Sequence, residues 1–442
     1  MMGVNSFNTQ KIPLSWFAAP PTLTPDDLKN AELVVTAGYQ FSKDFLQKIS
    51  AIALKIKPQE LVYVRCEYGV TTCFIAASEK HVFVAFGLKE QFRGGAFTKI
   101  TKATGLFFKW NGPQLKLERR TDVVKHTTNF YDRTSVDKIQ PILKRAHKRS
   151  QAAIDLKDCP YVAQVLAMGL HHGRAGAKMV MFFPEYHGDF IAFNNHLVAM
   201  RSSENFKESS SLNIKHNIIK VALDFSRALK FIHSKGYIHR DLKADNLLVD
   251  WEACSEDCPK ILRLNLTDFD LAYKTGDGRE ELDRLIGVPD FSPPEVLCIK
   301  LDFMDYLTLL GVDNLNDLLS PAIDTWYLGS ILHHLKYRCF HPCNELLENF
   351  LSLESKSRQP FSFNPEIDNQ RLIYQKKIVE AKAAWKKTVS EMIEEKNPDK
   401  DIVADPMAYF IWKLLRADPR KRPSDEEIEN FIEPYAKAHG VT

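Results

Sequence analysis

Residues 236–249 read GYIHRDLKADNLLV, and a second stretch, residues 266–272, reads LTDFDLA. The first stretch contains Asp241, Lys243 and Asn246, and the second contains Asp268. Residues 218–234, directly upstream, are expected to form a helix that leads into the first stretch. Two carboxylates, an amide and a lysine are thus concentrated in a short part of the chain, after a predicted helix.

The two stretches resemble the protein kinase superfamily in its eukaryotic-like form, which has a His-Arg-Asp motif, an asparagine five residues after the aspartate, and a later Asp-Phe motif. The resemblance implies ATP and Mg²⁺ as cofactors. Asp241 is then expected to accept the substrate hydroxyl proton, and Lys243 to steady the γ-phosphate. Asn246 and Asp268 are expected to bind Mg²⁺ through oxygen atoms. Alternatively, Asp241 and Asn246 only cap a turn between a helix and a hairpin; the second carboxylate, at the family's usual distance, favours catalysis.

Three further motifs follow in the order typical of this family: FSPPE at 291–295, DTWYLG at 324–329 and DPRKRP at 418–423. The resemblance implies that a buried Asp324 fixes the backbone of the catalytic loop, and that Glu295 pairs with Arg422. A lysine two residues after the catalytic aspartate is similar to the Ser/Thr-specific branch. We therefore expect transfer of the γ-phosphate of ATP to Ser or Thr hydroxyls of protein substrates.

The glycine-rich loop that kinases use to approach phosphate corresponds to residues 92–100, FRGGAFTKI. The outer glycines of the family pattern are replaced in this segment. Gly94, Gly95 and Ala96 are therefore the residues expected near the phosphates, because small side chains let backbone N–H groups come close. An ordinary hairpin turn is the alternative interpretation.

Two lysines are candidates for the ATP-contacting position of the family. Lys125 ends the segment DVVK, and Lys116 lies in QLKL. The distance from Gly95 favours Lys116, whereas the distance to the next landmark, Cys159 and Pro160, favours Lys125. Lys125 is our first choice.

The sequence also departs from the family pattern. The segment expected to supply a glutamate to the lysine, residues 138–154, reads KIQPILKRAHKRSQAAI and has no acidic residue, and Asp270 stands where the family has glycine. The altered glycine-rich loop and the missing glutamate support a second hypothesis, a pseudokinase or nucleotide-binding interaction module with little catalysis. A kinase of a non-protein substrate is a third. The basic helix at 138–149 is a candidate site for an acidic or phosphorylated partner, or else a solvated helix face.

The order of elements predicts an α+β protein, with strands up to about residue 193 and mostly helices from about residue 212. With the resemblance, this predicts a bilobed protein-kinase-like fold, with a small β-rich N-lobe and a large α-helical C-lobe. We expect an N-terminal accessory segment at 1–80, the N-lobe at 81–187 and the C-lobe at 188–442. Insertions are expected near 298–320 and 355–400.

Composition and charge exclude several other classes. Of the 442 residues, 45% are hydrophobic, enough for a folded core. The 59 Lys and Arg nearly balance the 56 Asp and Glu, so the chain has no large excess of positive charge. We therefore do not expect nucleic-acid binding. The sequence has no apolar run of ~18 residues, so we expect no transmembrane helix. Residues 1–21 do not resemble an ordinary signal peptide.

The expected location is cytoplasmic, because eight cysteines in a chain of this length suggest a reducing compartment. The eukaryotic-like catalytic half, joined to an eroded small lobe, also resembles effector kinases that intracellular bacteria secrete. For a bacterial effector, the expected location is the host cytosol.

Overall fold

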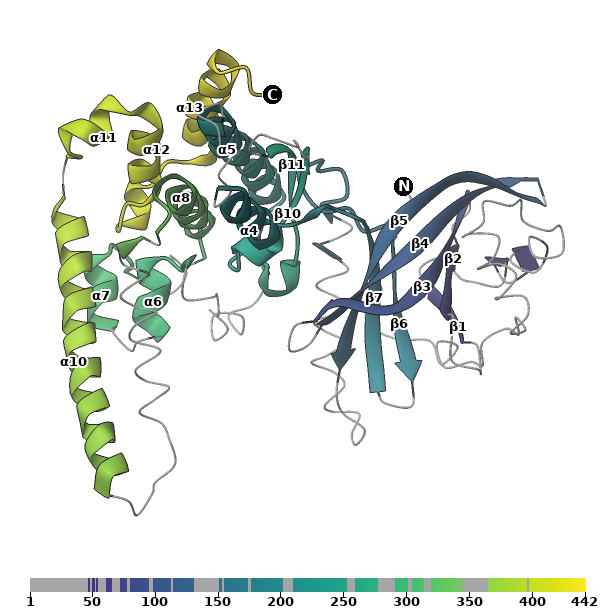
Figure 1. The fold of residues 1–442 in the computed structure, drawn as a ribbon, viewed down its shortest axis with the longest axis horizontal. Helices are drawn as coiled ribbons and strands as arrows, with labels where there is room; N and C mark the ends of the chain where they lie inside the picture. The colour runs from purple at the N-terminus through teal and green to yellow at the C-terminus, as the bar shows by residue number, and fades with distance from the viewer. Residues whose placement is uncertain are drawn as a thin grey trace. The chain divides into compact units, whose positions relative to one another are not determined.

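The computed structural model describes residues 61–65, 72–77, 80–94, 98–112, 114–130, 151–152, 155–173, 176–201, 210–252, 259–276, 291–300, 304–313, 319–339, 341–342, 344, 365–395 and 397–442, together with residues 47, 50, 51, 53 and 54. The chain divides into two compact units, residues 1–186 and residues 187–442 (Figure 1). Each unit is described by itself.

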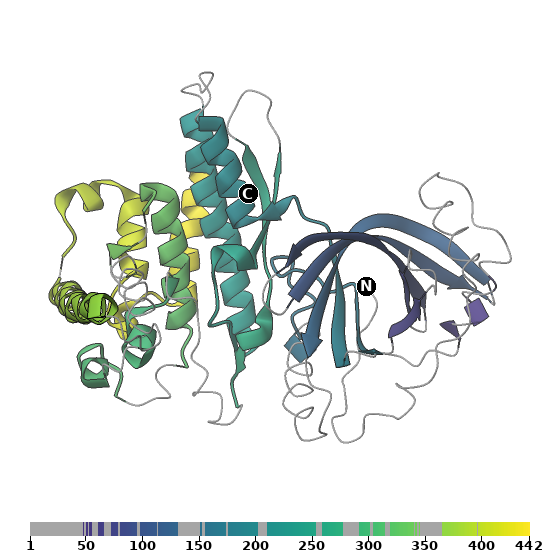
Figure 2. The same ribbon diagram turned by 60° about the horizontal axis from the view of Figure 1, so that its bottom comes forward.

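Within the described part of the first unit, seven strands form one antiparallel sheet in the order β1-β2-β3-β4-β5-β7-β6. They are β1 (Leu61–Arg65), β2 (Thr72–Ala77), β3 (His81–Gly94), β4 (Thr98–Asn111), β5 (Gln114–Phe130), β6 (Ala167–Gly173) and β7 (Gly176–Pro184). The sheet curls strongly, so that β1 and β6, at opposite ends of the strand order, approach each other (Figure 2).

Glycines lie at the described ends of two hairpins of this sheet. Gly94 at the end of β3 pairs with Lys99 of β4, and Asn111 at the end of β4 pairs with Gln114 of β5. Gly112, between the last two, has a φ of 60°, a left-handed conformation that costs glycine little. Strands β3, β4 and β5 therefore follow one another as antiparallel neighbours, and the second connection turns at Gly112.

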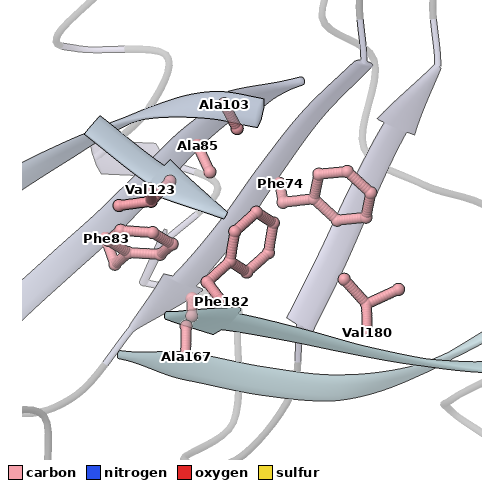
Figure 3. Packing of buried hydrophobic residues seen from close by; sticks show 9 residues of the cluster. Phe74, Phe83, Ala85, Ala103, Val123, Ala167, Val180 and Phe182 are labelled. Atoms are coloured by element: carbon pink, nitrogen blue, oxygen red, sulfur yellow. The ribbon is translucent and has the colours of Figure 1, made fainter. Parts of the chain in front are cut away.

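A cluster of aromatic and small residues fills the space inside the curl (Figure 3). Phe182 of β7 lies at the centre, with its ring 5.3 Å from the rings of both Phe74 and Phe83, in edge-on geometries that aromatic pairs favour. Ala85 and Ala103 provide small side chains beside these large rings. Alternating residues of neighbouring strands thus build a core that holds β2, β3 and β7 together.

The second unit combines two small sheets with helices. The sheets have the orders β11-β10-β8 and β12-β9 among the described residues. Their strands are β8 (Gly188–Asp189), β9 (Tyr237–Ile238), β10 (Leu247–Glu252), β11 (Lys260–Leu266) and β12 (Tyr273–Lys274). The helices are α4 (Phe190–Arg201), α5 (Ser210–Ser234), α6 (Pro294–Lys300), α7 (Met304–Leu309), α8 (Ala322–Tyr337), α10 (Pro365–Glu394), α11 (Lys400–Ala404), α12 (Pro406–Leu414) and α13 (Asp425–Ala438), with short 3-10 helices η2 (Ala244–Asn246), η3 (Phe269–Leu271) and η7 (Pro419–Lys421).

Helix α8 is the buried centre of this unit. Its residues 323–332 are all buried, so this part of the helix has no solvent face, and the helix packs against α5 and α12. Helix α13 packs against α5 and begins with a capping box, in which Ser424 and Glu427 satisfy each other's backbone N–H groups. The ends of α5, α8 and α13 are thereby held near one another.

The predicted fold class is confirmed: a curled sheet forms the first unit, and a mainly helical body forms the second. Residues 61–65 and 72–77, within the predicted accessory segment, form two strands of the main sheet. The predicted insertions contain α7 and α10. The basic helix at 138–149 lies outside the described residues. No helix in the described ranges combines the length and apolar character needed to span a membrane.

Candidate active site

The backbone brings the two motif stretches together. Strand β10, which begins within the last residues of the first stretch, pairs with β11, which leads into the second, so that Leu247 lies opposite Leu266. The Thr267 N–H donates to the carbonyl oxygen of Asn246 at 3.0 Å. Strand β9, at the start of the first stretch, pairs with β12, just after the second. These pairings place Asp268 two residues after Leu266 and Asn246 one residue before Leu247, at the same end of the ladder.

Three of the predicted site residues are in direct contact. The Asn246 Nδ2 donates to the backbone oxygen of Asp241 at 2.7 Å and to its Oδ2 at 3.3 Å. The Lys243 Nζ lies 3.3 Å from the same Oδ2. Asp241 and Asn246 are both buried, so these contacts hold the carboxylate in one orientation. Because the amide nitrogen of Asn246 is engaged in this way, its Oδ1 is the atom suited to a cation.

Asp268 has an unusual backbone and an exposed side chain. It caps η3 with φ 65° and ψ 65°, a left-handed conformation that costs a non-glycine residue ~1 kcal/mol or more. Carboxylate and amide oxygens are the hard ligands that Mg²⁺ prefers, and Mg²⁺ is usually held by few protein groups together with phosphates and water. Asn246 and Asp268 fit that requirement. Among the described residues, no cluster of three or more His, Cys, Asp or Glu could hold a metal ion alone.

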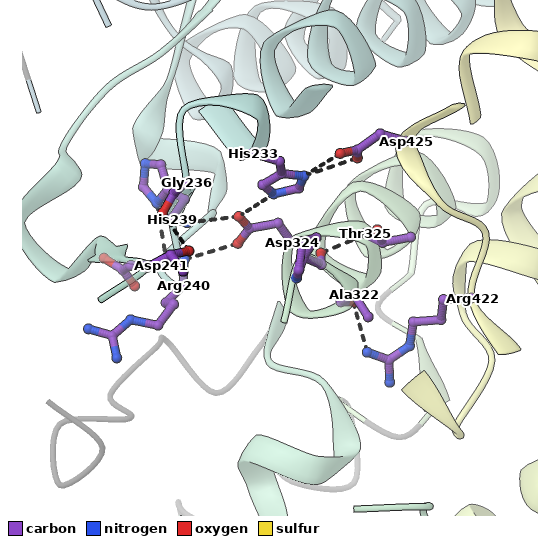
Figure 4. A network of polar contacts seen from close by, with 12 residues as sticks. His233, Gly236, His239, Arg240, Asp241, Ala322, Asp324, Thr325, Arg422 and Asp425 are labelled. Atoms are coloured by element: carbon purple, nitrogen blue, oxygen red, sulfur yellow. Dashed lines mark hydrogen bonds and ion pairs between the residues drawn. The ribbon is translucent and has the colours of Figure 1, made fainter. Parts of the chain in front are cut away.

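Asp324, in the first turn of α8, anchors the loop that carries Asp241 (Figure 4). Its Oδ2 accepts from the His239 N–H at 2.7 Å, and its Oδ1 accepts from the Arg240 N–H at 3.0 Å. Arg240 has a φ of 65°, and the Tyr327 Oη, one turn along α8, donates to its carbonyl oxygen at 3.0 Å. A fully buried carboxylate thus holds a strained backbone next to Asp241. The prediction that Asp324 fixes this loop is confirmed.

Side chains of the loop also hold the second stretch. The His239 Nε2 lies 2.9 Å from the carbonyl oxygen of Thr267, and its ring packs 4.6 Å from that of Phe269. The Arg240 Nε donates to the carbonyl oxygen of Leu271 at 2.7 Å. The two residues before Asp241 therefore contact the backbone on both sides of Asp268.

Sequence reasoning missed two residues behind this loop. His233, near the end of α5, places its Nε2 3.0 Å from Oδ2 of Asp324 and its Nδ1 2.8 Å from Oδ2 of Asp425. Burial alone would lower the pKa of His233, but the hydrogen bonds to the two carboxylates outweigh it and raise the pKa to about 9. For Asp324, burial favours the neutral form, yet His233 and the loop N–H groups hold its pKa below the ordinary value. No motif marks either partner in the sequence.

The remaining predicted site residues belong to the first unit. Lys125 of β5 pairs with Thr101 of β4 and with Phe182 of β7, and its Nζ lies 5.1 Å above the ring of Phe74. Lys116 is exposed and pairs with Lys109. Lys125 is therefore partly buried beside the aromatic core, whereas Lys116 is at the solvent-facing end of the hairpin.

Gly94 is the last residue of β3, and Gly95 and Ala96 lie outside the described residues. Glu118, an acidic residue of β5, contacts groups other than these lysine candidates: its Oε2 is 3.5 Å from Nε2 of His81, and its Oε1 is 4.0 Å from Nζ of Lys109. The structure thus brings Asp241, Lys243, Asn246 and Asp268 together in the second unit. The nucleotide-contact candidates are in the first unit.

Comparison with known proteins gives a family match over this part of the chain. Residues 185–432 match the model of the protein kinase domain, which is more than half of the chain and includes all of the catalytic stretch.

Curated relatives are also kinases by name. A probable myosin light chain kinase of Dictyostelium discoideum is 29% identical over 163 residues, 35% of this chain and 33% of that protein. A probable serine/threonine-protein kinase of Zea mays is 27% identical over 200 residues, 45% and 22% of the respective chains. A serine/threonine-protein kinase of Saccharomyces cerevisiae is 26% identical over 235 residues, 50% and 33%. The matched part of the chain spans a third or less of the length of each of these relatives.

Proposed function

This chain belongs to the protein kinase family, and from that premise we propose that it transfers the γ-phosphate of ATP, with Mg²⁺, to serine or threonine hydroxyls of protein substrates. The observation that carries the proposal is the contact of Asp241 with Asn246 and Lys243, on a loop that Asp324 anchors. The family alone does not ensure catalysis; an intact and oriented set of these side chains supports it.

Each side chain has a role that its contacts suit. Asp241, held by the Asn246 amide, orients the substrate hydroxyl and accepts its proton. Lys243, beside the same carboxylate, places a positive charge where the transferred phosphoryl group develops negative charge. Asn246 and Asp268 hold Mg²⁺, which neutralises phosphate charge when it is bound. Phosphoryl transfer needs positioning and charge stabilisation more than covalent help, and this loop supplies both.

In the first unit, Lys125 is the better candidate for the phosphates of ATP. Its strand pairs with β7, and its side chain lies inside the curl of the sheet. Lys116 is exposed and lies opposite Lys109 on β4, so its side chain is not partly buried beside the core as that of Lys125 is. The phosphate-approaching role of Gly94, Gly95 and Ala96 stays part of the proposal.

A nucleotide-binding pseudokinase is the second candidate. Its support is the altered glycine-rich segment, the absence of an acid at 138–154 and the aspartate at position 270. One assay separates the two: purified chain is incubated with γ-labelled ATP, Mg²⁺ and a mixed protein substrate, followed by phospho-amino-acid analysis. We expect label on serine or threonine.

The matched variants are Asp241→Asn, which keeps the shape of the side chain, and Asp245→Asn, which neutralises an exposed aspartate of the same loop. Loss of the base should lower turnover at least ~100-fold, and the control should keep it. Thermal stabilisation by ATP without label transfer in the unaltered protein would establish the pseudokinase instead.

A further inference from the structure

Three helix ends meet at the His233 side chain (Figure 4). His233 comes from the last turn of α5, Asp324 from the first turn of α8, and Asp425 from the first residue of α13. The side chains of His233 and Asp324 are 4% and 0% exposed, and that of Asp425 is 21% exposed. A carboxylate–imidazole–carboxylate chain therefore runs from the last helix to the catalytic loop.

The geometry requires both ring nitrogens of His233 to carry protons. A carboxylate oxygen faces each nitrogen, at 3.0 Å and 2.8 Å. Neutral imidazole has one N–H and one lone pair, so a neutral ring would direct its lone pair at one of these anions. Only the imidazolium satisfies Asp324 and Asp425 together.

The charges around the ring agree with this protonation state. Asp324 on α8 and Asp425 on α13 are the carboxylates that face it, and hydrogen bonds to them outweigh the effect of burial on the pKa of His233. On α5 itself, the Lys230 Nζ is bonded to Glu429 of α13 rather than to either carboxylate. On the catalytic loop, the His239 ring is directed at a carbonyl oxygen.

The α13 helix is held in register with α5 by further pairs. Lys230 bonds Glu429, and Arg227 bonds Glu433 through both its Nε and its Nη2. These partners recur about one helical turn apart on both helices, so the start of α13 is placed against the end of α5. These ion pairs thus place Asp425 next to His233.

We propose that Asp425 is a positioning residue for phosphotransfer: it holds the imidazolium of His233 against Asp324, and so fixes the loop backbone that carries Asp241. This rests on the proposed kinase function for its kinetic readout. The consequence is that the last helix, far from the reacting groups, controls their alignment. Without Asp425 the ring loses one of its two anions, Asp324 loses its cation at moderately alkaline pH, and the His239 and Arg240 amides lose a firm acceptor.

The test compares Asp425→Asn with Glu429→Gln, a matched removal of one carboxylate from the same face of α13. In NMR titration of the full chain, with the His233 signal assigned by its loss in His233→Gln, we expect Asp425→Asn to lower the His233 pKa by about one unit or more. The Glu429→Gln variant should leave that pKa in place. The same His233 pKa in the unaltered protein and in Asp425→Asn would overturn the proposal.

The kinetic arm measures kcat and KM for ATP between pH 6 and 10. We expect Asp425→Asn to lower kcat about 10-fold at pH 8.5 and to shift the alkaline limb of kcat downward, with KM for ATP nearly unchanged. The control variant should show neither change. A uniform loss of kcat at every pH would mean general destabilisation and would also overturn the proposal. If the unaltered protein shows no turnover, the proposed kinase function is wrong, but the role of Asp425 is still tested. Shifts of the His239 and Arg240 amide signals in Asp425→Asn then decide whether Asp425 positions the loop.

Discussion

Arg422 and Glu295 form a two-point ion pair in the interior of the second unit. Nη1 lies 2.6 Å from Oε1 and Nη2 lies 2.7 Å from Oε2, and the two side chains are 0% and 1% exposed. Arg422 also donates to the carbonyl oxygen of Ala322 at 2.9 Å and lies 5.0 Å above the ring of Trp326. The pair that the sequence motifs predict is confirmed, and it ties the start of α6 to the start of α8.

Removing one partner of this pair should destabilise the second unit strongly. Arg422→Met leaves the Glu295 carboxylate buried without a counter-charge, which typically costs ~3–5 kcal/mol. Arg422→Met combined with Glu295→Leu should recover part of that loss, because neither charge then remains. Urea unfolding measures both, with Glu391→Gln, which breaks an exposed pair on α10, as the control. Equal unfolding free energies for Arg422→Met and the control would contradict the assignment.

The two lysines of β5 should differ in their effect on nucleotide use. Lys125→Met should raise the ATP concentration needed for half-maximal rate or abolish turnover, because Lys125 is partly buried beside the core of the sheet. Lys116→Met should change little, because that side chain is exposed. Steady-state kinetics over a range of ATP concentrations give the ranking. The reverse order would move the nucleotide contact to the other end of the strand.

Replacing Asp268 should weaken metal binding and turnover but leave the stability of the fold nearly unchanged. Its side chain is exposed, so Asp268→Ala should keep the unfolding temperature within a few degrees, yet lower turnover at least ~100-fold by removing a metal ligand. Glu252→Ala, an exposed acid on β10, is the control. Turnover and Mn²⁺ binding are measured on both variants. Full turnover in Asp268→Ala would exclude this residue as a metal ligand.

Stability should fall as the solution becomes alkaline. The pKa of His233 is raised from an ordinary 6.5 to about 9 in the folded chain. The folded state therefore binds the proton more tightly than the unfolded state, and this stabilisation is complete below pH ~6.5 and lost as the pH rises to ~9. The full difference corresponds to ~3 kcal/mol.

Chemical unfolding of the native protein and of His233→Gln at pH 6 and pH 9.5 measures this effect. The unfolding free energy of His233→Gln should depend less on pH over that interval. In the acid range the direction reverses, because the pKa of Asp324 is lowered in the folded state, and its contribution is lost as the pH falls below ~3.8. A native protein equally stable at pH 6 and pH 9.5 would rule out a bound proton on His233.

Much of the catalytic half could be predicted because its chemistry is local in sequence. Asp241, Lys243 and Asn246 lie within six residues, and the contacts among them follow from one tight turn. The strands around Gly112 could be predicted for the same reason, since turn residues between apolar runs specify a hairpin. The choice between Lys116 and Lys125 could not, because it depends on which segment of a long strand meets β7.

Sequence patterns alone were enough to predict the family, the succession of a sheet and then helices, and the residue types around Asp241. They also predicted the Glu295–Arg422 pair, because a family motif marks each partner. The fold in three dimensions was needed to show that residues 61–65 and 72–77 extend the main sheet, and that His233 contacts Asp425, 192 positions later. The reason is that neither contact has a local signature: each arises where separate elements pack together, and the side chains that meet there are ordinary in their own segments.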